Sequence, residues 1–168
     1  TVKSFIYVFN MAEDEITKSS SDIVKQYELE GLISDAAVVG ISAKIECELS
    51  GLPDDQKAEF LESFGIKEPG LNSLVRVCYK TLGLQSFFTA GEQEARAWTV
   101  NVGSTAPEAA GKIHTDFEKK FIKAEVVSYD DFVSCGGWSG SKEKGKARLE
   151  GKDYVVKEAD VMFFHHGK

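Results

Sequence analysis

The sequence predicts an α/β module followed by an α+β module within one chain of 168 residues. In the first half, two continuous apolar runs of strand length, residues 4–9 and 36–41, flank a helical segment. From residue 84 onwards the pattern changes to short strands around one helix. The charge changes as well: residues 1–83 hold 8 Lys and Arg against 14 Asp and Glu, whereas residues 84–168 hold 12 against 13. These three observations together favour two modules.

The first half predicts a strand–helix–strand unit followed by two helices. Residues 4–9 (SFIYVF) are rich in aromatic and β-branched side chains, so we expect a strand buried on both faces. Serines 19–21 can cap the next helix, and residues 36–41 (AAVVGI) predict a second buried strand that completes a right-handed βαβ unit. An acidic helix should follow from Pro53 to about residue 64, and a strongly amphipathic helix from residue 71 to 82.

The second half predicts strands around a single long helix. Strands are expected at residues 85–89 and 95–102, joined by a turn at 90–92, and Thr105 should cap a helix that runs to about residue 121. A strand at 122–128, a helical turn at 129–133 and a Gly/Ser/Lys-rich loop at 136–145 should follow. The tail, residues 146–164, predicts strands interrupted at 158–160. Two strands, a helix and further strands are the order of a β-grasp, ubiquitin-like module.

Composition excludes several classes of protein. No apolar run approaches 18 residues, so a membrane-spanning helix is not expected. The start does not have the pattern of a signal peptide, and because it predicts a strand within a fold we expect a cut or processed terminus. The cysteines, Cys47, Cys78 and Cys135, lie far apart and form no CxxC pair, which favours reduced thiols over zinc ligands or disulfides.

Polar residues follow each predicted strand of the first module. Residues 10–13 (Asn-Met-Ala-Glu) come after the first strand, and residues 42–44 (Ser-Ala-Lys) come after the second. Ligands of open α/β sheets bind at the carboxyl ends of strands, so both loops are expected to face one ligand. An Asn amide donates and accepts hydrogen bonds at once, which suits a purine ring. The alternative interpretation is that Asn10 and Glu13 only cap the following helix.

The first of these loops differs from the guanine-reading loop of GTPases, which has the pattern Asn-Lys-x-Asp. Here Met11 replaces the lysine, and Glu13 replaces the aspartate that accepts from both guanine donors. A longer carboxylate moves the acceptor, and a bidentate base contact is worth roughly 1–3 kcal/mol. We therefore expect the loop to have lost a strong preference for guanine.

Basic residues gather in and after the predicted helix of the second module. The cluster consists of Lys112, His114, Thr115, Asp116, Lys119, Lys120 and Lys123. Three of these lysines, at positions 112, 119 and 123, are expected near one face at helical spacing, with Phe117 and Phe121 turned inward. Such a face suits RNA phosphates, and the alternative is a solvated helix face interrupted by acids.

Further candidate residues carry weaker signals. A second basic group, Lys142, Lys144, Lys146, Arg148 and Lys152, surrounds glycines. Such a loop can contact nucleic acid, or its charges can simply keep it soluble. The phosphate-loop pattern GxxxxGK[ST] is absent from the chain. His165 and His166 should point to opposite faces of a strand and so cannot bind one metal together. His114 has no nearby Ser or Cys that indicates a catalytic triad.

Four segments resemble the carboxy-terminal TGS domain of the Obg-like ATPases, the YchF family. They are residues 88–91 (FTAG), 94–99 (EARAWT), 111–119 (GKIHTDFEK) and 150–156 (EGKDYVV). The resemblance extends over essentially the whole chain. The loop from Asn10 to Glu13 is similar to the altered base-recognition motif of that family, which is associated with ATP in place of GTP, and Ser42-Ala43 resembles the loop that completes the base pocket.

The resemblance implies three segments. Residues 1–50 would be the carboxy-terminal part of a P-loop nucleotide-binding domain, residues 51–83 a helical connector, and residues 84–168 the TGS domain. It also implies site residues: Asn10, Met11, Glu13, Ser42 and Ala43 for the base, and Lys112, His114, Lys119, Lys120 and Lys123 for nucleic acid.

The implied protein is a cytoplasmic, ribosome-associated ATPase. It would bind ATP, with GTP as the alternative, together with Mg²⁺, and would contact ribosomal RNA or ribosomal protein but no membrane. Because the phosphate-binding parts are absent here, we expect this chain to be inactive alone, with no firm cofactor of its own. The alternative function is a stand-alone protein-interaction module that uses a sheet edge and does not depend on nucleotide.

Overall fold

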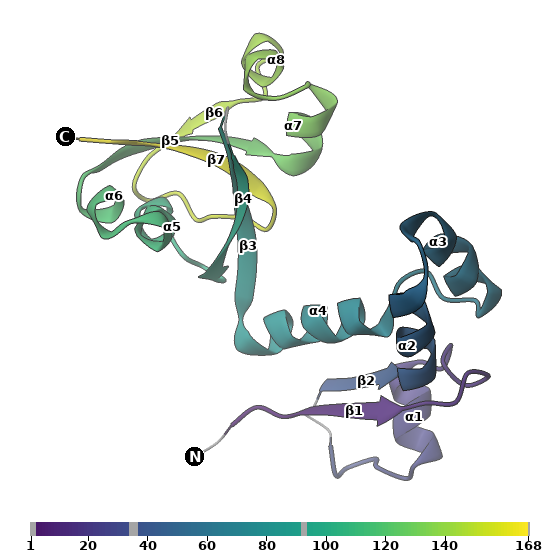
Figure 1. Ribbon diagram of the computed structural model, residues 1–168. Coiled ribbons are helices and arrows are strands. Elements are labelled where there is room, and N and C mark those ends of the chain that lie inside the picture. Colours follow the sequence, from purple (N-terminus) through teal and green to yellow (C-terminus); the bar gives the residue numbers. More distant parts are fainter. Residues whose placement is uncertain (1–2, 34–36, 92–93, 168) are drawn as a thin grey trace. The chain divides into compact units, whose positions relative to one another are not determined.

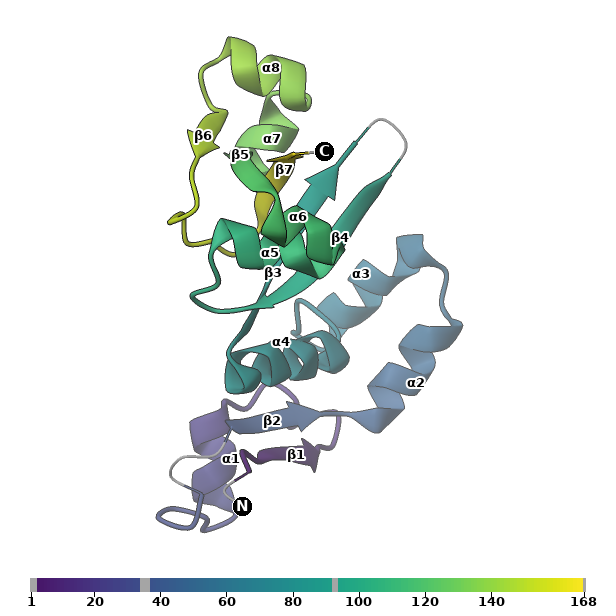
Figure 2. The same cartoon turned by 90° about the vertical axis from the view of Figure 1, so that its left-hand side faces the viewer.

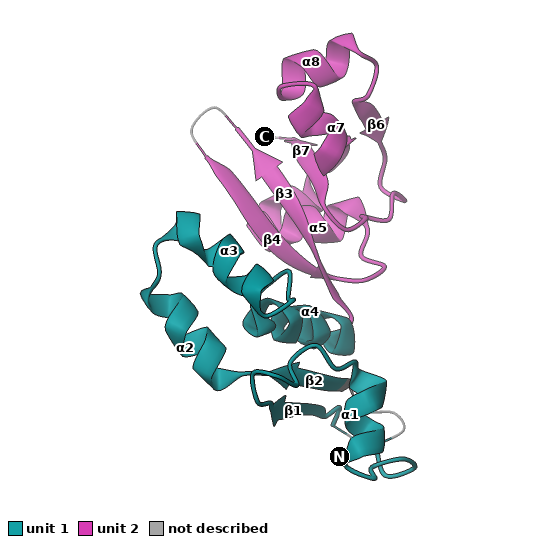
Figure 3. Ribbon diagram, turned by 90° about the vertical axis from the view of Figure 1, so that its right-hand side faces the viewer, with its two compact units in different colours: residues 1–82 teal, residues 83–168 magenta. Residues whose placement is uncertain are grey.

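The computed structural model describes residues 3–33, 37–91 and 94–167. Contacts divide the chain into two compact units, Thr1–Leu82 and Gly83–Lys168 (Figure 3). Both contain helices and strands, so the mixed α/β character predicted from the sequence is confirmed. None of the helices in the described part of the chain is long and apolar enough to cross a membrane.

The first unit begins with a strand–helix–strand arrangement and continues with three helices. Its elements are β1 (Ile6–Asn10), α1 (Ser20–Gln26), β2 (Ala37–Ile41), α2 (Ala43–Gly51), α3 (Asp54–Ser63) and α4 (Gly70–Leu82). The two strands are parallel, with a register that runs from Ile6 opposite Ala37 to Asn10 opposite Ile41. Residues 34–36 lie outside the described residues, and among them is residue 36, at which the second strand was predicted to begin.

Local sequence explains the start of α1 and the core beneath it. Ser19 and Asp22 form a reciprocal capping box, in which each side chain accepts from the backbone of the other residue. Ile23 on α1 is buried together with Val38 of β2. The prediction that β1 is buried on both faces was wrong, because Tyr7 and Val8 are 39% and 44% exposed. Within the described residues β1 pairs with β2 alone, which leaves part of its surface open.

The helices after β2 are only partly as predicted. The start and end of α3 and α4 agree with the sequence pattern to within about one residue. In contrast, α2 was not predicted, and it begins directly after Ser42. Ile45 and Leu49 lie one turn apart on α2 and form a second small core with Leu61 of α3. That spacing of four residues is a helical signal within the sequence itself.

The second unit is a five-stranded mixed sheet with short helices. Its elements are β3 (Leu84–Ala90), β4 (Ala95–Asn101), α5 (Ala106–Ile113), α6 (Thr115–Lys119), β5 (Phe121–Ser128), α7 (Tyr129–Ser134), α8 (Trp138–Glu143), β6 (Arg148–Glu150) and β7 (Asp160–His166). The strand order is β4-β3-β7-β5-β6. The first and last strands of the unit, β3 and β7, are parallel neighbours, and the other pairs are antiparallel.

The core of this unit lies between the sheet and α5. Three buried alanines of α5, Ala106, Ala109 and Ala110, allow the helix to approach the sheet closely. Phe87 on β3 is fully buried and packs edge-to-face with Phe164 of β7. The helices α5 and α6 cover one face of the sheet, and α7 and α8 lie toward the other (Figures 1 and 2).

Three predictions about the second unit were wrong. The predicted continuous helix from Thr105 to residue 121 breaks at His114, whose φ and ψ of −158° and 139° are those of a strand. The predicted loop at 136–145 contains α8. The segment predicted as a strand around Val155 forms only one isolated bridge, to Thr105.

Candidate functional site

The two polar loops of the first unit meet at one edge of its sheet. Parallel pairing brings Asn10 opposite Ile41, so both strands end at the same level (Figure 2). The side-chain oxygen of Asn10 accepts a hydrogen bond from the N–H of Ala43 at 3.0 Å. The N–H of Met11 donates to the carbonyl of Ile41 at 2.7 Å. The loops after β1 and β2 are therefore tied directly to each other.

Met11 supports this edge from inside the unit. Its side chain is 4% exposed and packs with Ile23 and Val38. A Cβ added at Gly40 would lie 3.2 Å from Met11 Cγ and 3.0 Å from Ile23 Cδ1, so the glycine makes room for both side chains. Ser42 is 3% exposed at the start of α2. Both residues therefore shape the loops rather than present a side chain to solvent.

Glu13 forms an ion pair with Lys44, 31 residues further along the chain. The lysine nitrogen lies 3.0 Å from the carboxylate. The side chain of Lys44 is 65% exposed and that of Glu13 is 35% exposed. The hydrogen bond to Glu13 raises the pKa of Lys44 above its ordinary value. The sequence placed Lys44 in this loop but did not predict the pairing, because the two residues meet only when the strands pair.

The edge has groups that suit a purine base. The bond to Ala43 uses the amide oxygen of Asn10, and the amide nitrogen at this exposed position can still donate to a ring nitrogen. The carboxylate of Glu13 can accept from an exocyclic amine. These groups fit the base of a nucleotide and provide no cradle of backbone amides for its phosphates.

The basic residues of the second unit do not form one helical face. Lys112 lies on α5, Lys119 ends α6, and Lys120 follows it. Lys123 lies on β5, where alternation places it on the face opposite to Ala124, which is buried under α5. The prediction of one face at helical spacing was wrong because the chain leaves the helix at His114 and enters a strand at residue 121.

His114 has a structural role in this segment. Its Nδ1 accepts the N–H of Asp116 at 3.2 Å, which caps the start of α6. The carboxylate of Asp116 lies 3.9 Å from the same nitrogen, so an acidic group interrupts the basic surface. All five predicted nucleic-acid residues are exposed. Their contact with RNA therefore stays a prediction, as does the alternative of a solvated face.

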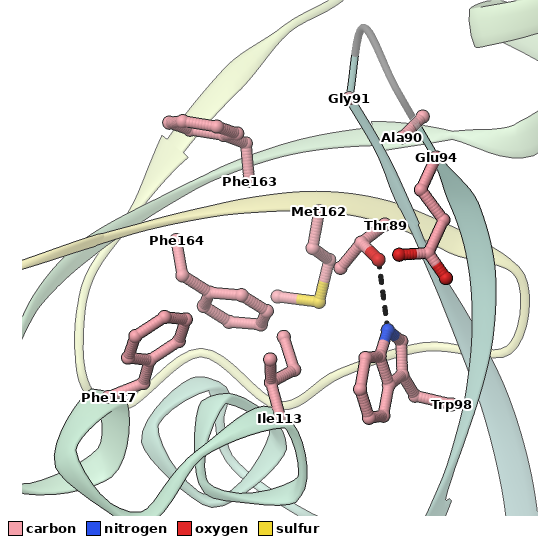
Figure 4. Close-up of a pocket in the computed structure, with 10 residues that line it drawn as sticks. All are labelled: Thr89, Ala90, Gly91, Glu94, Trp98, Ile113, Phe117, Met162, Phe163 and Phe164. Atoms are coloured by element: carbon pink, nitrogen blue, oxygen red, sulfur yellow. Dashed lines mark hydrogen bonds between the residues drawn. The ribbon is translucent and has the colours of Figure 1, made fainter.

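A pocket of about 550 Å³ opens in the second unit beside the tip of the β3–β4 hairpin (Figure 4). Its lining consists of Thr89, Ala90, Gly91, Glu94, Trp98, Ile113, Phe117, Met162, Phe163 and Phe164. The Nε1 of Trp98 donates to the hydroxyl of Thr89 at 2.9 Å, which fixes the indole ring. Among the described residues that line the pocket, only Glu94 has a charged side chain. The sequence does not predict the pocket, because its walls come from five separate elements, β3, β4, α5, α6 and β7, and from the turn between β3 and β4.

His165 and His166 lie on opposite sides of β7, as the sequence predicts. His165 Nε2 is 3.0 Å from the carboxylate of Glu125, on the face that also holds Lys142 of α8. His166 stacks on Phe117 of α6 with ring centroids 4.0 Å apart. Within the described residues, no group of three or more His, Cys, Asp or Glu side chains could hold a metal ion.

Similarity to known proteins extends along nearly the whole chain. The ribosome-binding ATPase YchF of Haemophilus ducreyi is 52% identical over 166 residues, which cover 98% of this chain and 45% of that protein. The protein of the same name from Bacillus subtilis is 48% identical, with the same coverage. Obg-like ATPase 1 of Caenorhabditis elegans is 39% identical and is covered to 42% of its length.

A solved structure and a family model agree with these relatives. The YchF GTPase of Schizosaccharomyces pombe matches with a TM-score of 0.79 and 30% identity, over 97% of this chain and 43% of that one. The chain thus spans less than half the length of the relatives that it matches. The model YchF-GTPase_C, described as a protein of unknown function (DUF933), matches residues 84–167. The chain therefore belongs to the YchF family of Obg-like ATPases.

Proposed function

We propose that this chain acts within an ATP-binding and ATP-hydrolysing regulatory protein that associates with ribosomes, and that it supplies part of the base pocket. The hydrogen bond from the N–H of Ala43 to Asn10 carries this proposal, because it joins the two loops into one surface. The 168 residues contain no GxxxxGK[ST] loop. Hydrolysis, with Mg²⁺ bound to the phosphates, would therefore use residues outside this chain. The names of the relatives support the association with ribosomes.

The role of Glu13 is tested by the ratio of ATP to GTP affinity in the full-length protein. Glu13→Asp shortens the carboxylate to that of the guanine-reading loop, so GTP should gain relative to ATP by about tenfold. Met11→Lys is unsuitable as a test, because it would place a charge in the core beside Ile23. Glu15→Asp is the matched control, since Glu15 pairs with Lys18 outside the loop. An unchanged ratio in the Glu13 variant would remove this residue from base recognition.

We further propose that residues 84–168 form a TGS domain of β-grasp type that contacts the ribosome. The support is the parallel pairing of the first and last strands, β3 and β7, beneath α5. If Lys112 and Lys119 contact RNA phosphates, changing both to Ala should lower the salt slope of ribosome binding by about one to two. The pair Lys67 and Lys157, which is exposed and belongs to neither basic group, is the matched control. The RNA contact is contradicted if the Lys112 and Lys119 double variant keeps the salt slope of the unmodified protein.

Residues 51–83 are proposed as a connector that transmits nucleotide state between residues 1–50 and 84–168. On α4, Leu74 is partly buried and Val75 is 56% exposed. Val75→Ser should therefore weaken the nucleotide dependence of ribosome binding while the chain stays folded. The connector role is wrong if nucleotide changes the ribosome binding of Leu74 and Val75 variants as much as it changes that of the unmodified protein. A cytoplasmic location is part of the same proposal.

The second candidate function is a protein-interaction module without nucleotide dependence. The second unit has a core of its own, which favours a separable module. Two observations discriminate between the candidates: whether the reading frame contains a GxxxxGK[ST] loop upstream of this segment, and whether partner binding by the full-length protein changes with ATP. The interaction module is favoured if the reading frame contains no such loop and ATP does not change partner binding.

A further inference from the structure

The two edges of the five-stranded sheet differ in how they are protected. The edge strand β6 has only three residues, and two of them, Arg148 and Glu150, are charged and paired with each other at 3.2 Å. The other edge strand, β4, has seven residues and pairs with β3 along its whole length without a bulge. It contains neither proline nor lysine. Short length, charge, proline and bulges are the features that prevent edge pairing. The strand β6 is short and charged, whereas β4 is long and has one charged residue, Arg96, so β4 is the less protected edge.

The backbone of β4 presents hydrogen-bonding groups at the outer side of the edge. The bonds from Gly91 N–H to the Glu94 carbonyl and from Val102 N–H to the Gly83 carbonyl lie at the two ends of the hairpin. Because hydrogen-bonded and non-hydrogen-bonded pairs alternate in an antiparallel ladder, even-numbered residues of β4 bond to β3. Ala95 and Ala97 consequently direct their N–H and C=O groups away from β3. Both have small, exposed side chains that leave room for another strand.

The even-numbered side chains of β4, together with Glu94 directly before it, determine what kind of strand would fit. Glu94, Arg96 and Trp98 share one face of the sheet, and the guanidinium of Arg96 lies 4.4 Å from the centre of the Trp98 ring. Glu94 lies at the rim of the apolar pocket, with its side chain on the pocket side of the strand (Figure 4). An apolar wall beside one carboxylate suits a lysine or arginine, whose stem packs while its charged end meets the carboxylate.

An unpaired carboxylate indicates the kind of partner that would fit this edge. Residues 84–168 hold 12 Lys and Arg against 13 Asp and Glu, so net charge alone does not select the occupant. Among the described residues the side chain of Glu94 has no hydrogen-bond or ion-pair partner, and a basic segment would supply one. We propose that β4 accepts an extended, basic segment of a partner protein as an additional antiparallel strand, with a lysine or arginine facing Glu94. This interaction surface is independent of the proposed nucleotide site, and it gives the chain a second kind of partner contact.

The test uses a synthetic peptide and this chain. In the peptide acetyl-KLVTVKK-amide, valines face Ala97 and Ala95, and the penultimate lysine faces Glu94. Binding is measured by calorimetry, with circular dichroism as the check of folding. Ala97→Pro removes one outward N–H while the pairing with β3 is kept, and it should weaken binding by at least about tenfold. Ala97→Val keeps that N–H and is the matched control, with affinity expected within about twofold.

A charge reversal provides the second arm and does not depend on the proline variant. Glu94→Lys should weaken binding of the lysine peptide by about fivefold to tenfold, and should strengthen binding of the peptide whose penultimate lysine is replaced by glutamate. The proposal is overturned if the lysine peptide shows no saturable binding up to about 1 mM, or if neither variant changes its affinity. It is also overturned if sedimentation shows self-association that Ala97→Pro abolishes, since the occupant would then be a second copy.

Discussion

The close approach of α8 to the end of α7 should not tolerate a single added methyl group. Gly140 lies within α8, and a Cβ at this position would be 3.0 Å from the carbonyl carbon of Cys135 and far inside contact distance of its oxygen. Cys135 ends α7, and its N–H donates to the Asp131 carbonyl at 2.9 Å. The obstacle to the methyl group is therefore backbone that is itself held by a helix, so Gly140→Ala requires the two helices to move apart.

The expected cost follows from two opposing effects. Alanine is favoured over glycine within a helix by up to about 1 kcal/mol, which offsets part of the cost. Overpacking against a fixed backbone typically costs about 1–3 kcal/mol. In addition, Trp138 on α8 packs edge-to-face on Phe132 with ring centroids 5.3 Å apart, and a shift of α8 disturbs this contact. We expect Gly140→Ala to lower the free energy of unfolding of this unit by about 2 kcal/mol.

Gly111 provides the matched control. A Cβ at Gly111 in α5 would also meet a close neighbour, the exposed side chain of Glu118, with the carboxylate nearest and its Cβ at 3.2 Å. The carboxylate can rotate away at little cost and only the tight contact with the Glu118 Cβ remains, so the helix preference of alanine should dominate. We expect Gly111→Ala to change the free energy of unfolding by less than about 1 kcal/mol, with stabilisation as the favoured sign.

Urea unfolding followed by tryptophan fluorescence measures both variants. The chain has two tryptophans, Trp98 and Trp138, and both lie in the second unit, so the signal reports that unit alone. The reasoning is refuted if Gly140→Ala unfolds at the same urea concentration as the unmodified chain. It is equally refuted if Gly111→Ala proves as destabilising as Gly140→Ala, because the nature of the neighbouring atom would then not decide the outcome.

Three further substitutions test the core, the ion pairs of Glu125 and the hydrogen bond of Tyr154 to Asp160 in the second unit. Phe87→Ala removes a fully buried ring and should cost about 3–5 kcal/mol, so a loss below about 1 kcal/mol would contradict its place in the core. The hydrogen bond from Lys142, and then that from His165, hold the pKa of Glu125 below its ordinary 4.5. The stability from this carboxylate is therefore complete above about pH 4.5 and is lost as the pH falls through the lowered pKa. Glu125→Gln should flatten this acid dependence, and an unchanged slope would argue against the pairing. Burial, and then Asp160, raise the pKa of Tyr154 to about 12, so the stability from its protonated form is present below about pH 10 and lost as the pH rises towards 12. Tyr154→Phe should cost about 1 kcal/mol at neutral pH and remove that alkaline loss, which spectrophotometric titration can follow.

The sequence was sufficient where local signals decide the structure. The apolar run before Asn10, the serine cap of α1 and the periodicity of α4 each depend on residues within a few positions of one another. The motif segments, among them residues 111–119, were sufficient for the family resemblance. Parallel pairing of β1 and β2 followed from their apolar character, and it brought the loops of Asn10 and Ala43 together as expected.

Only the tertiary structure decided which distant residues meet and on which face they lie. Residues 105–121 have a helical pattern, yet His114 adopts an extended conformation because its side chain caps α6 and the chain must turn into β5. The face occupied by Lys123, the pairing of Glu13 with Lys44 and the open edge at Ala97 all depend on strand register. Register is determined by contacts between segments far apart in the sequence, so no local pattern contains it.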